Sequence, residues 1–221
     1  MSIVEMLIAT AIGLFVMAAT ISLFVTNLGN MRRLNTEARV NQDMRTAAEL
    51  VARDLRRAGF WQNAVSGTVT DNVTKTTTEN PYVAVSSTTA GVSNGEITYN
   101  FARDANNALN TGERFGFRLL GGVIEMLPDG VTWQPITNSD VVTINNFTIT
   151  PTVTTLPTGD ICMKSCAPGS VSPEGTACPT LTVRRYALLL RGTSTADNQV
   201  ARELRSSIRV RNDQFAGVCP L

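Results

Sequence analysis

Glu5 is the first residue whose chemistry needs an explanation, because it is the only charged side chain in the first thirty-one residues. The apolar run around it exceeds the roughly twenty residues that a helix needs to cross a bilayer. A carboxylate in the middle of a membrane costs about 2.5–3.5 kcal/mol even on lenient insertion scales. We therefore expect Glu5 to be paired with a cation, and the natural candidate is the α-amino group of Met1 in a neighbouring copy of the chain.

The apolar run admits three interpretations. A secretory signal peptide is disfavoured, because no Lys or Arg precedes Arg32 and no small-residue cleavage site is evident after the run. A plain single-span anchor fits the length but gives no reason for an acid at the fifth position. The first basic residues follow the span, which leaves the N-terminus outside the cell unless a basic leader has been removed. We favour the removed leader.

The four cysteines carry the second recognisable chemistry of the chain. Cys162, Cys166, Cys178 and Cys219 form an even set, which in an exported protein predicts two disulfides. A zinc site is disfavoured because the chain has no histidine. If 181–191 and 204–211 form a hairpin, its open end brings Cys178 toward Cys219 and leaves Cys162 to bridge Cys166. All three possible connectivities remain open, and this pairing is the one we expect.

Nothing in the chain predicts catalysis. There is no histidine to act as a base and no Gly-rich phosphate loop, so we expect neither an enzyme, nor a cofactor, nor a metal site. The net charge of +1 gives no reason to expect bulk binding of nucleic acid. Seven of the nineteen basic residues do fall between Arg184 and Arg211. We expect a solvated strand face with acidic neighbours on another subunit, and a patch that contacts DNA or a surface is the alternative.

A single long helix must position Glu5. No Pro occurs before Pro81, and apolar residues continue at helical steps of three and four after the uncharged run, at Met31, Leu34, Ala38, Met44, Ala48, Val51, Leu55 and Ala58. Residues 2–58 are therefore expected to form one helix of about 85 Å at 1.5 Å per residue. Residues 1–30 are apolar on all sides and predict a membrane or filament-core helix. Residues 31–60 are amphipathic and predict packing on a globular head.

The remaining chain, 61–221, has the short apolar runs and Gly, Pro and Asn breaks of a β-rich domain. A polar, Thr-rich stretch over 62–95 predicts a long surface loop. The predicted class is α+β, a long N-terminal helix packed on an antiparallel sheet. The strand candidates are 82–85, 96–101, 115–120, 123–126, 131–134, 141–150, 181–191 and 204–211; the last of these alternates apolar and polar residues, as a half-buried strand does.

Three stretches carry a resemblance to a known family. Glu5 at the head of a long apolar helix resembles the mature type IV pilins and the type II secretion pseudopilins. The stretch ELVARDLRRAGFWQNA, 49–64, resembles the PilW family of minor pilins, and 116–149 resembles the sheet region of PilW-like pilins and of pseudopilin J. In this reading Gly59 ends the helix, while Phe60 and Trp61 anchor the chain in the head.

The resemblance implies the type IV pilin fold and a structural role in a pilus filament, as a priming or tip subunit or as a bulk building block. It implies cleavage by prepilin peptidase, a methylated Met1 amine, partnership with other pilins and the assembly machinery, and roles in motility or adhesion. It places the chain in the bacterial inner membrane, spanning it once, and then in the extracellular filament. The alternatives are a pilus-borne adhesin, a DNA-uptake receptor and a type II secretion pseudopilin. Within the filament, copies of the chain are expected to bury residues 1–30, with short helix breaks near Gly13 or from Thr20 to Gly29.

Overall fold

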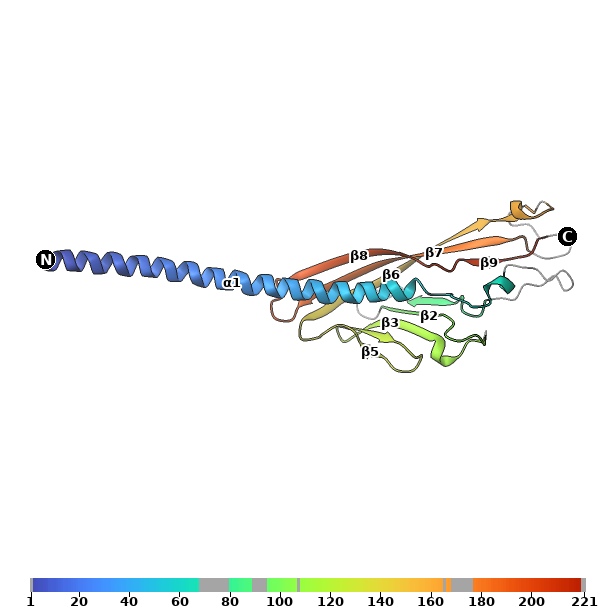
Figure 1. Cartoon of the computed structure of the whole chain (residues 1–221), viewed down its shortest axis with the longest axis horizontal. Helices are drawn as coiled ribbons and strands as arrows, with labels where there is room; N and C mark the ends of the chain where they lie inside the picture. Colours follow the sequence, from blue (N-terminus) through green and yellow to red (C-terminus); the bar gives the residue numbers. More distant parts are fainter. Residues whose placement is uncertain are drawn as a thin grey trace.

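The helix predicted over 2–58 is confirmed. A computed structural model describes residues 2–67, 80–88, 95–106, 108–164, 166–167 and 177–219, and its first element is the helix α1, Ile3–Leu55. These 53 residues span about 80 Å at 1.5 Å per residue. The first half of α1 projects away from the rest of the molecule, and its second half lies along the head (Figure 1). In the single chain α1 continues without a break through Gly13 and through Thr20 to Gly29.

The packing between α1 and the head begins later in the chain than the sequence pattern predicts. Leu34 is 64 % exposed and Ala38 is exposed, although both belong to the predicted packing face. Burial begins at Val40 and continues at three- and four-residue steps. The buried helix residues are Val40, Met44, Ala47, Ala48, Val51, Ala52, Asp54 and Leu55. Periodicity marks a face of a helix, but only the position of the head decides where along the helix that face is covered.

The helix ends through the stretch that contains Gly59. Arg56 is the C-cap, and turns follow until Gly59, which takes the left-handed φ of +72° and donates its N–H to Asn100 O at 2.8 Å. Trp61 then enters the head and is 5 % exposed, as predicted. The prediction that Phe60 is also buried is wrong, because Phe60 is 42 % exposed. Successive residues of an extended segment face opposite sides, so only one of the two rings can face the core.

The head contains two antiparallel sheets, which confirms the α+β class. The first sheet has the order β1-β2-β3-β4-β5 and uses chain up to Pro135, and the second has the order β6-β7-β8, with β9 also paired to β7. The first comprises β1 (Val85–Thr88), β2 (Glu96–Asn100), β3 (Arg114–Leu120), β4 (Val123–Leu127) and β5 (Gln134–Pro135). The second comprises β6 (Val142–Pro157), β7 (Thr180–Ser194), β8 (Ala201–Arg209) and β9 (Gln214–Ala216). Three short 3-10 helices, η1 (Ala64–Gly67), η2 (Thr111–Glu113) and η3 (Gly159–Ile161), connect these elements.

Most predicted strands are confirmed to within a few residues, and the exceptions are informative. The candidate 82–85 overlaps β1 only at Val85, and 131–134 overlaps β5 only at Gln134. The candidate 141–150 stops too early, because β6 runs on to Pro157. Its last eight residues are exposed and have no apolar alternation, so only their pairing with β7 makes them a strand. Much of the Thr-rich loop predicted over 62–95 lies outside the described residues.

The core forms where α1 and the two sheets meet. Its largest fully buried side chains include Tyr99 and Phe117 from the first sheet and Phe147, Leu188 and Ile208 from the second. The sheets are joined by a backbone hydrogen bond from Ile144 N–H to Gly122 O at 2.8 Å. This single core, reached by α1 through its second half, leaves the first half of α1 outside the domain.

A buried carboxylate, Glu113, ties three chain segments of the head together. It is 2 % exposed and accepts hydrogen bonds from the N–H groups of Arg103 and Asn110 and from the Tyr82 hydroxyl, at 2.8, 3.0 and 3.1 Å. Burial acts to raise the pKa of Glu113, but these donors together hold the pKa below its usual value. Burial and the neighbouring carboxylate raise the pKa of Tyr82 to about 12.

Replacing Glu113 with glutamine is expected to lower the free energy of unfolding by about 1–3 kcal/mol, because its three hydrogen-bond donors lose a charged acceptor. The pKa of Glu113 is lower in the folded state than in the unfolded state, where it is about 4.3, so the ionised carboxylate stabilises the fold above that pH. This stabilisation is lost as the pH falls through the folded-state pKa. The difference in the free energy of unfolding between the parent and Glu113→Gln should therefore become smaller from pH 6 to pH 3. Denaturant titrations followed by circular dichroism measure this difference. Glu49→Gln, which changes an exposed residue of α1, is the matched control. A difference in the free energy of unfolding that stays constant from pH 6 to pH 3 would contradict the conclusion that Glu113 is ionised in the folded protein.

Candidate assembly site

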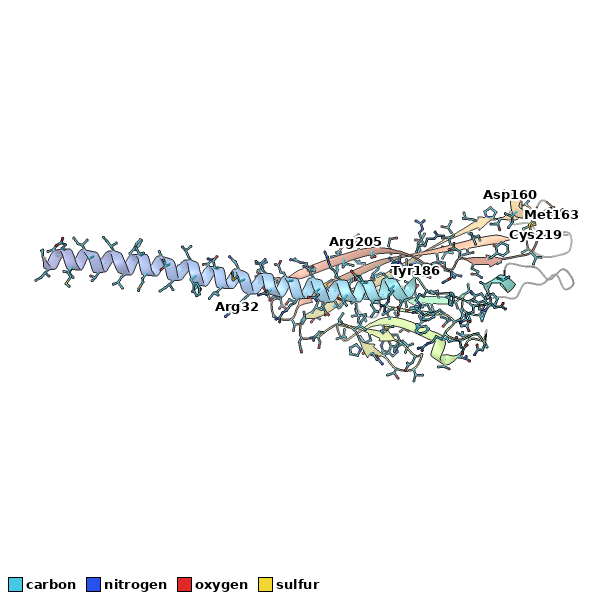
Figure 2. All side chains as sticks on the ribbon, in the orientation of Figure 1. Arg32, Asp160, Met163, Tyr186, Arg205 and Cys219 are labelled. Atoms are coloured by element: carbon cyan, nitrogen blue, oxygen red, sulfur yellow. A yellow bond between two sulfur atoms is a disulfide. The ribbon has the colours of Figure 1, made fainter. Side chains whose placement is uncertain are left out.

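The first half of α1 is an apolar surface that no other described part of the chain covers. An 18-residue window within α1 has a mean hydropathy of 2.3, which makes this helix long and apolar enough to cross a membrane. Its large apolar side chains from Ile3 to Met31 are between 40 % and 81 % exposed, and they extend into open space on all sides of the helix (Figure 2). Each gains roughly 1.5–3 kcal/mol on full burial, so this surface requires lipid or other protein chains around it.

Three threonine hydroxyls within this apolar half are satisfied by the helix itself. Thr10 donates to Leu7 O, Thr20 to Met17 O and Thr26 to Ser22 O, at 3.0, 2.8 and 2.9 Å. These bonds allow the three hydroxyls to remain in an environment without water. An ionised Glu5 cannot be satisfied in this way, because a carboxylate has no proton to donate to a carbonyl of the helix.

Glu5 lies exposed in the first turn of α1. There the positive end of the helix dipole favours a negative charge by about 0.3–1 kcal/mol. Among the described residues no side chain pairs with Glu5, and the next cation along the helix, Arg32, lies about 40 Å away at 1.5 Å per residue. A cation for Glu5 must therefore come from another molecule or from the N-terminal amine. Met1 lies outside the described residues, so its pairing with Glu5 stays a prediction.

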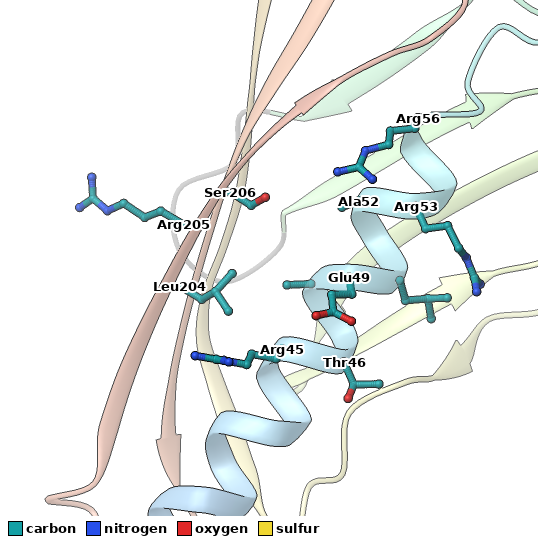
Figure 3. A pocket seen from close by; sticks show the side chains of 11 residues that line it. Arg45, Thr46, Glu49, Ala52, Arg53, Arg56, Leu204, Arg205 and Ser206 are labelled. Carbon is teal, nitrogen blue, oxygen red and sulfur yellow. The ribbon is translucent and has the colours of Figure 1, made fainter.

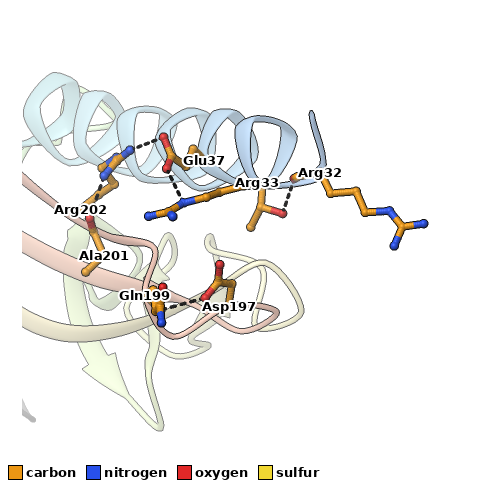
Figure 4. Close-up of polar contacts among 8 residues, drawn as sticks. Arg32, Arg33, Glu37, Asp197, Gln199, Ala201 and Arg202 are labelled. Carbon is orange, nitrogen blue, oxygen red and sulfur yellow. Dashed lines mark hydrogen bonds and ion pairs between the residues drawn. The ribbon is translucent and has the colours of Figure 1, made fainter. Parts of the chain in front are cut away.

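A set of ion pairs marks the place where α1 leaves the head. Glu37 pairs with Arg33 one turn earlier at 3.4 Å and with Arg202, at the start of β8, at 2.6 Å, while Arg32 points away (Figure 4). Exposed pairs of this kind contribute about 0.2–1 kcal/mol each. Through Glu37, Arg202 links the start of β8 to α1 just before the buried face of the helix begins at Val40.

A groove of about 790 Å³ separates the second half of α1 from β8. Ala48, Ala52 and Leu204 supply apolar surface, and Arg45 and Arg56 extend from α1 toward β8 across it, whereas Arg205 points away (Figure 3). Among the described residues, Arg45 and Arg56 make no ion pair. These two arginines leave positive charge along the groove, which Glu49 in the same lining offsets in part.

The arginines of β7 and β8 mostly have partners within the same chain. Glu203 pairs with both Arg191 and Arg205, and Asp213 accepts from Arg209 at 2.7 Å. The prediction that their acidic neighbours lie on another subunit is therefore wrong for these residues. The strand alternation does place them on a solvated face as predicted, but the hairpin turns and β9 bring the acids alongside. Three arginines against two acids leave this face with a net positive charge, smaller than the arginines alone would present to a polyanion.

The expected disulfide pairing is wrong. The bonds join Cys162 to Cys219 and Cys166 to Cys178, with Cα–Cα distances of 5.4 and 5.7 Å. The predicted β7–β8 hairpin exists, and its open end does bring the two segments together, since Val218 N–H donates to Ala177 O at 3.0 Å.

The extra length of β6 changes which cysteines meet. Pro157 pairs with Thr180, so β6 carries η3 and Cys162 to the same end of the sheet as β9 and Cys219 (Figure 2). Both disulfides therefore lie at the end of the head that is farthest from Glu5. No local sequence signal predicts the continuation of an exposed strand to Pro157.

A known family matches most of the chain. The model of the family described as prepilin peptidase-dependent protein B matches residues 33–210. The chain belongs to this family. It is a pilin-like protein related to type IV pili, and the match covers the head-packing half of α1 together with the strands from β1 to β8. No curated protein and no solved structure matches the chain significantly.

Family membership fits the arrangement of the site. An apolar helix that leaves a β-rich head fits a membrane anchor, and prepilin peptidase dependence points to the pilus assembly machinery. The match begins after the apolar half of α1, so the inference about Glu5 rests on the helix itself rather than on the family model.

Proposed function

We propose that this family member is a PilW-like minor subunit of a type IV pilus, which enters the filament through the first half of α1 and acts in priming assembly or as a building block. The observation that carries the proposal is the uncovered apolar helix with one unpaired acid in its first turn. Such a surface is stable in a bilayer before assembly and in a bundle of like helices afterwards.

In this proposal the chain is first processed, then held in the membrane and finally assembled into the filament. After prepilin peptidase has removed a leader and the Met1 amine has been methylated, the chain spans the inner membrane once, with its head outside the cytoplasm. On assembly, Glu5 pairs with the amine of a neighbouring pilin, and the head becomes part of the extracellular filament. The role is structural, and no catalytic step is assigned to any residue. The groove between α1 and β8 supports the proposal as a second surface for a neighbouring subunit.

Deletion of residues 1–30 tests whether α1 is the assembly element. We expect a soluble, monomeric head, because the core begins at Val40 and both disulfides remain. Sedimentation measures the oligomeric state, and fractionation of sheared filaments measures incorporation, with the full chain as the reference. Filaments that still contain the truncated head would refute the proposal.

The abundance of the chain in filaments distinguishes the roles within the proposal. Quantitative mass spectrometry of purified filaments should find few copies per filament for a priming or tip subunit, and the chain should dominate if it is the bulk subunit. A type II secretion pseudopilin is the second candidate, because it would use the same helix. Loss of protein secretion with normal pili in a deletion strain would favour that candidate.

A further inference from the structure

The second half of β6 is an edge strand with an open side. Among the described residues β6 pairs with β7 on one side, and its last eight residues, 150–157, are all exposed. This part of β6 is the outermost strand of the second sheet, at the end of the molecule far from the N-terminus (Figure 1). An uncovered edge presents a row of unpaired N–H and C=O groups, which is a template for pairing with another chain.

The register of β6 decides which of its backbone groups face the open side. Alternate residues of an antiparallel strand direct their N–H and C=O groups to the same neighbour. The pairing of β6 with β7 continues into a hydrogen bond from Thr158 N–H to Pro179 O at 3.0 Å. Even-numbered residues at this end of β6 therefore face β7, and residues 151, 153, 155 and 157 face the open side.

Two of these outward positions are prolines. Pro151 and Pro157 have no N–H, so within 150–157 only Val153 and Thr155 can donate to a strand on the open side. Each proline ring also fills the space in which the carbonyl of an added strand would accept. A strand laid along this edge would therefore lose its hydrogen bonds, and meet a ring, at both ends of the stretch.

The other features that protect a sheet edge do not act on this stretch. Edges are commonly protected by shortness, charge, a bulge, a covering segment or proline. However, β6 is 16 residues long, 150–157 contains no charged residue, and the one shift of register falls earlier, between Ile144 and Asn146. Val153 and Leu156 are 58 % and 45 % exposed and add apolar surface. Only the two prolines oppose pairing here.

We propose that Pro151 and Pro157 close the edge of β6 to strand addition and so prevent two heads from pairing through it. The excluded partner is the same edge of a second copy of the chain. A two-fold arrangement centred on residue 154 would place position 153 opposite 155 and position 151 opposite 157, so the two prolines would face each other in both outer pairs. The inference concerns the head alone and does not rest on the proposed filament role.

The test opens the edge in the full chain held in detergent micelles. Pro151→Thr combined with Pro157→Thr restores both donors and removes both rings. Hydrogen exchange followed by mass spectrometry on peptides covering 151–157 reports pairing at this edge and not association through α1. Exchange in the parent should be fast and independent of protein concentration. In the double threonine variant it should slow at least about tenfold as the concentration rises.

Pro151→Lys combined with Pro157→Lys is the matched control. It restores the same two donors, but it places like charges opposite each other in the two-fold pair, so exchange should remain fast at every concentration. Slow exchange of the core residues Leu188 and Leu190 in β7 shows that a variant remains folded.

The single threonine variants change less of the strand and should each show a smaller slowing; they decide the question if the double variant loses the protection of its core. The proposal is overturned by exchange that stays independent of concentration in folded threonine variants. It is also overturned by slowing in the parent, or by equal slowing in the lysine and threonine variants.

Discussion

Replacing Glu5 with valine is expected to reduce incorporation of the chain into filaments at least about tenfold, because removal of one partner from a buried ion pair costs roughly 3–5 kcal/mol. In the proposed filament the lost partner leaves the amine of the neighbouring subunit without a counter-charge in an apolar bundle. In the membrane the same change removes an unpaired acid and is tolerated. The ratio of filament-associated to membrane-associated protein, measured by immunoblot after shearing, reports this difference.

The matched controls for Glu5 separate charge from position. Glu5→Gln keeps the length of the side chain without its charge and should fail as Glu5→Val does, whereas Asp140→Asn, an exposed acid of the head that lies outside the groove, should assemble normally. The unfolding midpoint of the head should be the same in all three variants, because Glu5 contacts no residue of the core. Normal incorporation of the valine variant into filaments would show that assembly does not need Glu5.

Loss of the disulfide between Cys162 and Cys219 is expected to destabilise the head more than loss of the one between Cys166 and Cys178. The first closes a sequence separation of 57 residues and the second one of 12. The loop-entropy relation gives about 4 kcal/mol for the longer loop and about 3 kcal/mol for the shorter. Chemical denaturation of the paired serine variants, Cys162→Ser with Cys219→Ser and Cys166→Ser with Cys178→Ser, measures both values.

Peptide mapping without reduction checks the connectivity on which this order depends. The expected fragments link Cys162 to Cys219 and Cys166 to Cys178. Recovery of a fragment linking Cys178 to Cys219 would instead support the pairing that the hairpin alone predicts. Filament incorporation of the variants should fall only as far as the folded fraction falls, since both bonds lie at the opposite end of the molecule from Glu5.

The architecture separates two tasks along the length of the molecule. In the proposed filament, association through the apolar half of α1 is non-directional, because burial of apolar area depends little on side-chain detail. There Glu5, at one end of that half, would give the association a direction by pairing with the amine of a neighbouring subunit. The far end of the head carries the disulfides, so changes there are expected to alter head stability without touching the assembly surface.

The sequence by itself determined the features that arise from local pattern. The absence of Pro before Pro81 and the apolar steps through Leu55 predict α1, the alternation from Leu204 predicts β8, and the charge pattern singles out Glu5. Each of these signals is set by neighbours three, four or two residues away, so it can be read without knowledge of the fold. The left-handed Gly59 belongs to the same class, because only local backbone geometry is involved.

Only the tertiary structure decided the features that depend on distant partners. The continuation of β6 to Pro157 rests on pairing with β7, and that pairing, together with β9, selects the cysteines that bond. Likewise, Arg191 and Arg205 find Glu203 only because of strand register. Such contacts depend on register and sheet order, which a side-chain pattern along one segment does not specify.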